Sequence, residues 1–182
     1  AYTYDANGNR LTMVDANGTS RYAYDERNRL TGMTDAFGNT VGWAYDAAGL
    51  LARLAYPGGA SVAYAYDAAG NLTQRADAGG NTQSYTYNAA SRMVLEEHKL
   101  GGQQTDQKIS YQHDKDGKLK GYEQKDGQSA LISQASYTRD AQGRTANSSI
   151  TYGKVDGGTF SFQVGQGFNA DGRLKSHQYP DG

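Results

Sequence analysis

The 182-residue sequence contains no cysteine, no long apolar run and almost no net charge. Because cysteine is absent, disulfides and thiolate metal sites are excluded. No apolar run approaches the roughly 18 residues that a membrane-spanning helix requires. A net charge of −1 gives no basic field that would attract nucleic acid or an acidic membrane surface. We therefore expect neither nucleic acid as a partner nor insertion into a membrane.

Glycine and tyrosine, in contrast, are abundant. The chain has 24 glycines and 15 tyrosines but only four phenylalanines. Glycine supplies the backbone conformations that tight turns need, and tyrosine favours strands, where its ring is covered while its hydroxyl reaches a partner. The best helical candidate, residues 91–100, lacks a consistent apolar stripe. The composition therefore predicts an all-β chain with many turns.

One short motif, Tyr-x-Tyr-Asp-x-x-Gly-x-Leu-Thr, recurs along the chain. Its second tyrosine falls 20 or 21 residues apart, at Tyr4, Tyr24, Tyr45, Tyr66 and Tyr87. Later copies are spaced further apart and carry other residues in that position, namely His113, Arg139 and Phe168. We therefore predict one continuous repeat array, with regular repeats over residues 1–98 and divergent repeats with insertions over residues 99–182.

Each repeat contains a second turn signal about ten residues after the first, a spacing that suits hairpins of short strands. These signals start at Asp15, Asp35, Tyr56 and Asp77. Residues between the turns alternate with the period of two that a strand requires, so each repeat is predicted to be a β-hairpin. A single hairpin buries too little surface to be stable, whereas stacked hairpins extend one antiparallel sheet that twists and curls.

The recurring residues are predicted to have structural roles. The five tyrosines, together with leucines, would form the packed face of the sheet; the leucines are Leu11, Leu30, Leu51 and Leu72. The aspartates and glycines would shape the turns. The predicted structural set is Tyr4, Asp5, Gly8, Tyr24, Asp25, Tyr45, Asp46, Gly49, Tyr66, Asp67, Gly70, Tyr87, Asp114, Gly117, Asp140, Gly143 and Gly172.

The motif at this spacing resembles the YD repeat of RHS proteins. The best matches are "YDANGNRLT" at Tyr4, "YDERNRLT" at Tyr24 and "YDAAGNLT" at Tyr66. The resemblance implies a long β-sheet strip that spirals into a hollow shell. In bacterial polymorphic toxins and in insecticidal Tc-type toxin complexes, such a shell encloses a C-terminal toxin domain. Teneurins carry a related shell on animal cell surfaces.

Shells of this family are far longer than 182 residues. The resemblance therefore implies that the chain is a segment of the wall of a longer bacterial protein that is secreted or held at the cell surface. The implied partners are the flanking RHS repeats of the same parent chain and the enclosed toxin domain, with a secretion apparatus or a receptor as further candidates. No proline follows an aspartate, so the self-cleavage residues of the family's toxin-releasing motif are not carried over.

Three patterns could be read as chemistry, and each has a simpler explanation. The aspartates recur once per repeat, whereas an active site is normally unique. "DKDGK" at Asp114 resembles the start of a calcium loop, but the twelfth position, Lys125, lacks the glutamate that such a loop requires. His98, His113 and His177 are not at metal-ligand spacing. We therefore predict a protein that is not an enzyme, with no catalytic, cofactor-binding or metal-binding residues and no cofactor.

A second family keeps another function open. Choline-binding and glucan-binding cell-wall modules also repeat at about 20 residues, with aromatic pairs before an Asp-Gly turn. Those repeats depend on tryptophan, and this chain has only Trp43. The primary prediction is therefore a structural wall segment of a toxin shell. The alternative is a carbohydrate-binding repeat module of a bacterial cell-surface protein, in which a tyrosine ladder would stack against sugars.

Overall fold

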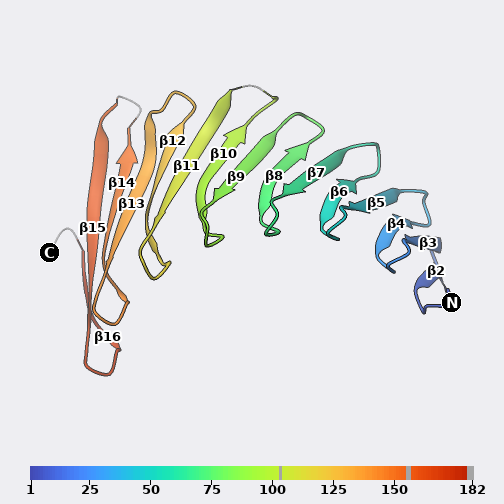
Figure 1. Cartoon of the computed structure of the whole chain (residues 1–182), viewed down its shortest axis with the longest axis horizontal. Coiled ribbons are helices and arrows are strands. Elements are labelled where there is room, and N and C mark those ends of the chain that lie inside the picture. Colours follow the sequence, from blue (N-terminus) through green and yellow to red (C-terminus); the bar gives the residue numbers. More distant parts are fainter. Residues whose placement is uncertain (103, 155–156, 180–182) are drawn as a thin grey trace. The chain divides into compact units, whose positions relative to one another are not determined.

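The computed structural model describes residues 1–102, 104–154 and 157–179, and these form sixteen strands. The order of the strands in the sheet follows the sequence from β1 to β16 (Figure 1). The described residues contain no helix, and therefore none that could cross a membrane. The prediction of an all-β chain of antiparallel hairpins is confirmed. The chain divides into two compact units, Ala1–Thr82 and Gln83–Gly182; the predicted division at residue 98 rests on repeat spacing and stays a prediction.

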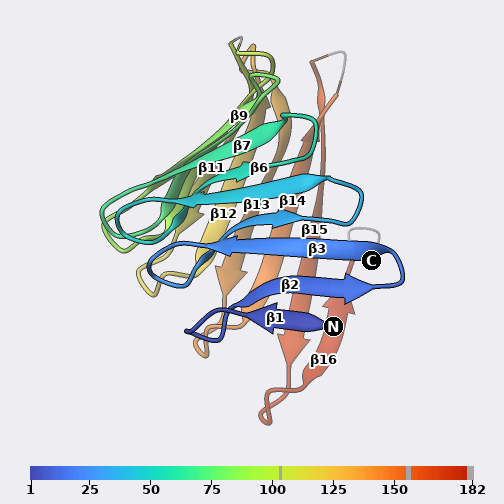
Figure 2. The same ribbon diagram turned by 90° about the vertical axis from the view of Figure 1, so that its right-hand side faces the viewer.

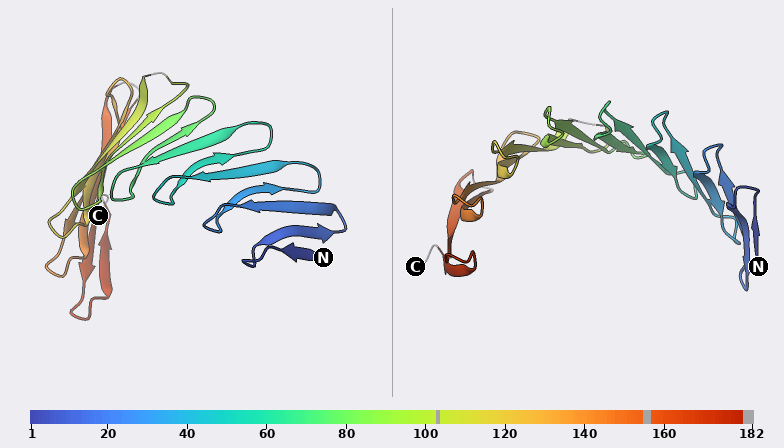
Figure 3. Two further views of the ribbon diagram at one scale, coloured as in Figure 1. Left: turned by 45° about the vertical axis from the view of Figure 1, so that its right-hand side comes forward. Right: turned by 60° about the horizontal axis from the view of Figure 1, so that its bottom comes forward.

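Unit 1 consists of short antiparallel hairpins. Figure 2 shows its first strands side by side, and Figure 3 shows its repeat turns gathered at one edge of the sheet. Strands of this length follow from turn signals only about ten residues apart. They are β1 (Tyr2–Tyr4), β2 (Arg10–Asp15), β3 (Gly18–Tyr24), β4 (Leu30–Thr34), β5 (Thr40–Tyr45), β6 (Leu51–Ala55), β7 (Ser61–Tyr66) and β8 (Leu72–Asp77).

Unit 2 has longer hairpins. The extra residues of the divergent repeats lengthen paired strands: β7 has six residues, whereas β13 has nine. The segment considered as a helix forms a turn and then β10. The strands are β9 (Thr82–Tyr87), β10 (Met93–Lys99), β11 (Thr105–His113), β12 (Leu119–Asp126), β13 (Leu131–Arg139), β14 (Thr145–Gly153), β15 (Thr159–Phe168) and β16 (Leu174–Gln178).

The two faces of each unit differ in burial. The face that carries Tyr24, Tyr45 and Tyr66, which we term the tyrosine face, is the better covered. Val62 is only 5% exposed, and Ser20, Ser133 and Ala135 are also buried there. Alternate residues on the opposite face, such as Ala65, are exposed. The tyrosine face is therefore where packing stabilises the sheet.

The repeat turns have one common geometry, shown by the first of them. The Asp5 amide donates to the Asn9 carbonyl over 2.9 Å, and the Gly8 amide donates to the Asp5 carbonyl over 3.1 Å. The strand register shifts between Thr3 and Tyr4. This is a type I turn followed by a bulge, which requires a left-handed residue in fourth place. Gly8 has a φ of 86° and meets that requirement without steric cost.

Three turns place a residue other than glycine in the left-handed position. Asn28, Ser91 and Ser129 have φ values of 59°, 55° and 69°. Each amide still donates to the carbonyl three residues earlier, so the turn geometry is kept. Asparagine tolerates this conformation better than serine because its side chain bonds locally. The backbone is therefore strained at Ser91 and Ser129.

Replacing Ser91 or Ser129 with glycine is expected to stabilise the chain. Relief of the left-handed penalty, about 1–2 kcal/mol, outweighs the added unfolded-state entropy, about 0.4–1 kcal/mol. Each variant should gain roughly 0.5–1 kcal/mol of unfolding free energy in urea titrations followed by circular dichroism. Ser148→Gly, within a strand, is the control and should lose about 0.5–1 kcal/mol. Equal losses of unfolding free energy in all three serine-to-glycine variants would show that the backbone is not strained at Ser91 and Ser129.

Candidate functional site

In most repeat turns an aspartate anchors the loop that follows it, and asparagine takes its place at Asn88 and Asn169. Asp67 Oδ1 accepts hydrogen bonds from the amides of Ala69 and Asn71, both over 2.9 Å, and Oδ2 accepts one from the Asn71 side chain over 2.9 Å. We term the residue four places after the aspartate the fifth turn residue. In two turns this residue is an arginine, and its Nε donates to the aspartate over 2.7 Å in Asp25–Arg29 and 2.6 Å in Asp140–Arg144.

These hydrogen bonds favour the ionised carboxylate. In four turns the largest effect is the asparagine side chain at the fifth position, which lowers the pKa of Asp5, Asp35, Asp67 and Asp77. The fifth residue's amide is the largest cause of the lowered pKa of Asp25 and Asp114. For Asp140 the largest effect is desolvation, which raises the pKa, but the hydrogen bonds from Arg144 and Gln142 and the charge of Arg144 together lower it further. The turn carboxylates are thus stabilised as anions.

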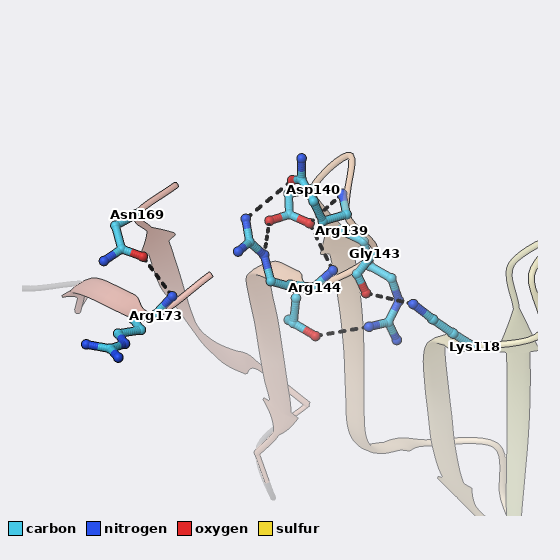
Figure 4. Close-up of polar contacts among 9 residues, drawn as sticks. Lys118, Arg139, Asp140, Gly143, Arg144, Asn169 and Arg173 are labelled. Atoms are coloured by element: carbon cyan, nitrogen blue, oxygen red, sulfur yellow. Dashed lines mark hydrogen bonds and ion pairs between the residues drawn. The ribbon is translucent and has the colours of Figure 1, made fainter. Parts of the chain in front are cut away.

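The fifth turn residue also reaches the next repeat. The Arg29 guanidinium carbon lies 4.3 Å from the centre of the Tyr45 ring, and Arg144 stacks on Phe168 over the same distance. Lys118 instead donates to the Gly143 carbonyl over 2.9 Å (Figure 4). These contacts join residues 16 to 25 positions apart in the sequence. They link neighbouring turns along the edge of each unit.

These cross-repeat contacts give the turn glycines a second role. A Cβ at Gly49 would lie 3.3 Å from an Arg29 nitrogen, and the Arg92 guanidinium occupies the place that a Cβ at Gly117 would take. Glycine therefore supplies the positive φ and also leaves room for the long side chain of the preceding repeat. The predicted turn glycines all have positive φ: Gly8, Gly49, Gly70, Gly117, Gly143 and Gly172.

The strand-ending tyrosine adds a hydrogen bond to the preceding repeat. The Tyr45 hydroxyl donates to the Leu30 carbonyl over 2.9 Å, and the Tyr66 hydroxyl donates to the Leu51 carbonyl over 3.0 Å. Arg139 stands in the tyrosine position of a divergent repeat, and its Nη2 donates to the Leu119 carbonyl over 2.9 Å. An arginine thus replaces the phenol as donor to the equivalent carbonyl. We term these cross-repeat contacts the clasp.

Replacing Arg139 with methionine is expected to weaken unit 2. The variant loses the hydrogen bond to Leu119, a second one to the Thr145 hydroxyl at 3.2 Å, and the ion pair of Nε with Asp114 Oδ2 at 3.5 Å. The expected loss is about 1.5–3 kcal/mol of unfolding free energy, measured in urea. Arg139→Tyr restores a hydroxyl donor and should stay within about 1 kcal/mol of the parent. Arg173→Met is the control, since within the described residues only the backbone of that exposed residue makes hydrogen bonds. If Arg139→Tyr lost as much unfolding free energy as Arg139→Met, arginine and tyrosine would not be equivalent donors at this position.

The predicted structural residues lie where strands meet turns. The tyrosines end β1, β3, β5, β7 and β9, and the aspartates follow them. Tyr4 is 57% exposed, and its strand β1 pairs with β2 alone. The prediction that Leu11 belongs to the packed face is wrong: Arg10 lies opposite Tyr4 where Leu30 lies opposite Tyr24, and Leu11 is 39% exposed.

A separate polar cluster lies on the tyrosine face of unit 2. His98 Nε2 lies 2.6 Å from Glu96 Oε1, and the Tyr111 hydroxyl donates to Glu96 Oε2 over 3.1 Å. Burial, followed by the charge of Glu96, raises the pKa of Tyr111 to about 12. His113 ends β11 in the tyrosine position. Within the described ranges, no three His, Asp or Glu side chains are grouped to hold a metal ion.

The family is decided by a sequence profile. The RHS Repeat family matches four overlapping stretches, residues 4–40, 24–61, 45–82 and 66–104. The chain belongs to the RHS repeat family. The matched stretches begin at the strand-ending tyrosines Tyr4, Tyr24, Tyr45 and Tyr66, so each covers two successive repeats of this RHS chain. No curated protein matches the sequence.

Solved structures with a similar fold come from Tc toxins. The crystal structure of TcdB2–TccC3 has a TM-score of 0.73 at 16% identity, over 98% of this chain and 11% of that one. The structure of the form without the hypervariable C-terminal region has a TM-score of 0.72 at 16% identity, over 98% of this chain and 11% of that one. The structure of the Photorhabdus luminescens Tc holotoxin pore has a TM-score of 0.69 at 17% identity, over 90% of this chain and 9% of that one. The RHS chain thus shares their fold and spans 9–11% of their length.

Proposed function

We propose that this RHS chain is a wall segment of a shell that encloses the C-terminal toxin domain of a secreted bacterial protein. The observation that carries the proposal is the clasp. Tyr45, Tyr66 and Arg139 each donate a hydrogen bond to the preceding repeat, and Arg29 and Arg144 reach into the following one. Contacts of this kind let a sheet grow by adding repeats and not by closing around a core. Such a wall acts by steric containment and needs no catalytic group.

The fold likeness to TcdB2–TccC3 supports this role. The partners would be the flanking repeats of a longer chain and the enclosed toxin domain, with a secretion apparatus or a receptor as further candidates. The protein would act outside the cell that makes it. The tyrosine ladder of the alternative, sugar-binding function is less well supported, because the hydroxyls of Tyr45 and Tyr66 are used within the sheet and Arg29 stacks on the ring of Tyr45.

The proposal can be tested on the full-length protein that contains these residues. Limited proteolysis is compared between that protein and its C-terminal region produced alone. We expect the C-terminal region to resist protease in the full-length protein and to be digested when alone. The triple variant Tyr45→Phe, Tyr66→Phe, Arg139→Met, which removes clasp donors, should restore cleavage, whereas the control Arg173→Met should not. A C-terminal region cut equally fast in both forms would overturn the proposal.

A further inference from the structure

Two asparagines of unit 1 are followed directly by glycine, Asn7 by Gly8 and Asn17 by Gly18. This pair of residues can react spontaneously, because glycine has no side chain to keep the asparagine away from its amide nitrogen. The nitrogen bonds to Cγ of the asparagine, the bond from Cγ to Nδ2 breaks, and ammonia leaves with the amide proton. Water then opens the five-membered ring at either carbonyl and leaves aspartate or isoaspartate.

The side chain of Asn7 is held by the next repeat. Asn7 Nδ2 donates to Asn28 Oδ1 over 3.0 Å, and the same oxygen accepts a hydrogen bond from Asn9 Nδ2 over 2.7 Å. The Gly8 amide also donates to the Asp5 carbonyl over 3.1 Å. For Cγ of Asn7 to bond to the Gly8 nitrogen, the hydrogen bond to Asn28 and the one from Gly8 must both be broken.

Asn28 is therefore more than a turn residue. It has a φ of 59°, in a position that glycine fills in most of the other turns. Glycine would adopt this conformation with less strain but has no side chain to accept a hydrogen bond. The Asn28 side chain spans the two turns and fixes the carboxamide of Asn7, which lies 21 residues earlier.

The turn that contains Asn17 is built differently. β2 ends at Asp15 and β3 begins at Gly18, so only Ala16 and Asn17 connect the two strands. Asp15 Oδ1 accepts a hydrogen bond from the Asn17 amide over 2.8 Å. The Asn17 side chain is exposed and makes no hydrogen bond with any residue that the structure describes. Its carboxamide is thus free to rotate toward the Gly18 nitrogen.

A reaction at Asn17 would alter the β2–β3 hairpin. Aspartate would place a second negative charge two residues from Asp15. Isoaspartate would add one carbon atom to the main chain inside a connection of two residues. The strands on either side of this connection pair Met13 with Ser20, and Ser20 is only 7% exposed. The modification would therefore lie next to a packed part of the tyrosine face.

We propose that Asn17 is a site of spontaneous deamidation in the folded chain and that the hydrogen bond to Asn28 protects Asn7 from the same reaction. The reaction consumes one water, releases one ammonia and changes no oxidation state. It needs no enzyme and no cofactor. The inference does not depend on the proposed wall function, since it rests only on turns within unit 1.

The test incubates the 182-residue chain at mildly alkaline pH, both folded and unfolded in guanidinium chloride. Trypsin cleaves after Arg10 and Arg21 and so places Asn7 and Asn17 in different peptides, in which mass spectrometry measures aspartate and isoaspartate. We expect comparable rates at both sites in the unfolded chain. In the folded chain Asn17 should stay within about fivefold of its unfolded rate, whereas Asn7 should slow at least about tenfold because two hydrogen bonds must break.

A variant of Asn28 tests the protection directly. Asn28→Gly removes the acceptor but keeps the left-handed turn, so the rate at Asn7 should rise about fivefold, the effect of one neutral hydrogen bond, while the rate at Asn17 stays unchanged. Asn28→Asp keeps an acceptor oxygen and should leave Asn7 slow. Ser91→Gly makes the matching change at a left-handed position of unit 2 and should alter neither rate.

Either half of the inference can be overturned. Equal slowing of Asn7 and Asn17 in the folded chain would mean that Asn17 is as well protected as Asn7. An unchanged rate at Asn7 in Asn28→Gly, with circular dichroism showing the variant folded, would mean that Asn28 does not protect it. If Asn28→Gly does not fold, Asn28→Ser takes its place, since Ser91 and Ser129 show that serine is accommodated at this turn position.

Discussion

Acidification below about pH 4 is expected to unfold the chain cooperatively, because the turn aspartates have pKa values below those of an unfolded chain. The pKa is lowered at both edges of the hairpins, in Asp5, Asp25, Asp35, Asp67, Asp77, Asp114 and Asp140. A group with a depressed folded pKa contributes stability above its unfolded pKa and loses it as the pH falls through the folded value. The stability should therefore be flat from pH 7 to about 5 and fall steeply below pH 4.

The effect is large because the same linkage repeats along the chain. Protonation weakens the hydrogen bonds that Oδ1 and Oδ2 accept in each of these turns. The resulting losses of unfolding free energy add where the turns are far apart. Urea midpoints measured at pH 7, 5, 4, 3 and 2.5 would show uptake of several protons on unfolding at the acidic end. A midpoint that falls evenly from pH 7 downward would contradict an origin in these carboxylates.

The chain contains its own control for this linkage. Asn88 and Asn169 occupy the aspartate position in two turns and do not titrate. Asn88 Oδ1 accepts hydrogen bonds from the amides of Ala90 and Arg92, and Asn169 Oδ1 accepts one from the amide of Arg173. Replacing Asp67 and Asp140 with asparagine should lower stability at pH 7 and flatten the fall below pH 4. At pH 2 the parent and the variant carry nearly equal charge, so general repulsion cannot produce this difference in slope.

The turns were predictable from the sequence because their chemistry is local. The aspartate, the glycine and the hydrogen bonds between them lie within five residues, so the motif specifies the loop wherever it occurs. The contacts of Arg29 and Arg139 with neighbouring repeats were not predicted, since their partners are 16 and 20 residues away. A polar or basic residue recurs at the fifth position, as in Asn9, Asn71 and Arg144, and that recurrence was the available signal.

The misplacement of Leu11 has a simple physical cause. Aligning the first repeat by its Leu-Thr pair places Leu11 with Leu30, but the first turn contains one more residue before that pair. The structure aligns the repeats by their turns, so Arg10 takes the leucine position. Because side chains alternate between faces, a slip of one residue moves a side chain to the other face. Spacing from the turn is therefore the better guide to the packed face.

Replacing Val62 with aspartate is expected to have the largest effect of any single substitution considered for unit 1. Val62 is 5% exposed on the tyrosine face, opposite Leu54 on one side and Asp77 on the other. An aspartate there loses the burial of the valine and places an unpaired carboxylate beside Asp77. The expected loss is about 3–5 kcal/mol of unfolding free energy in urea, enough to unfold much of a marginally stable unit.

Neighbouring variants separate burial from charge. Val62→Ala removes two methyl-sized groups without adding a charge and should cost about 1.5 kcal/mol. Ala63→Asp adds the same carboxylate one residue along, on the exposed face, and should change stability by about 0.5 kcal/mol or less. Comparable losses for Val62→Asp and Ala63→Asp would mean that the tyrosine face is no better packed than its opposite. A large difference identifies the tyrosine face as the one whose packing stabilises unit 1, because only a covered position penalises a charge so strongly.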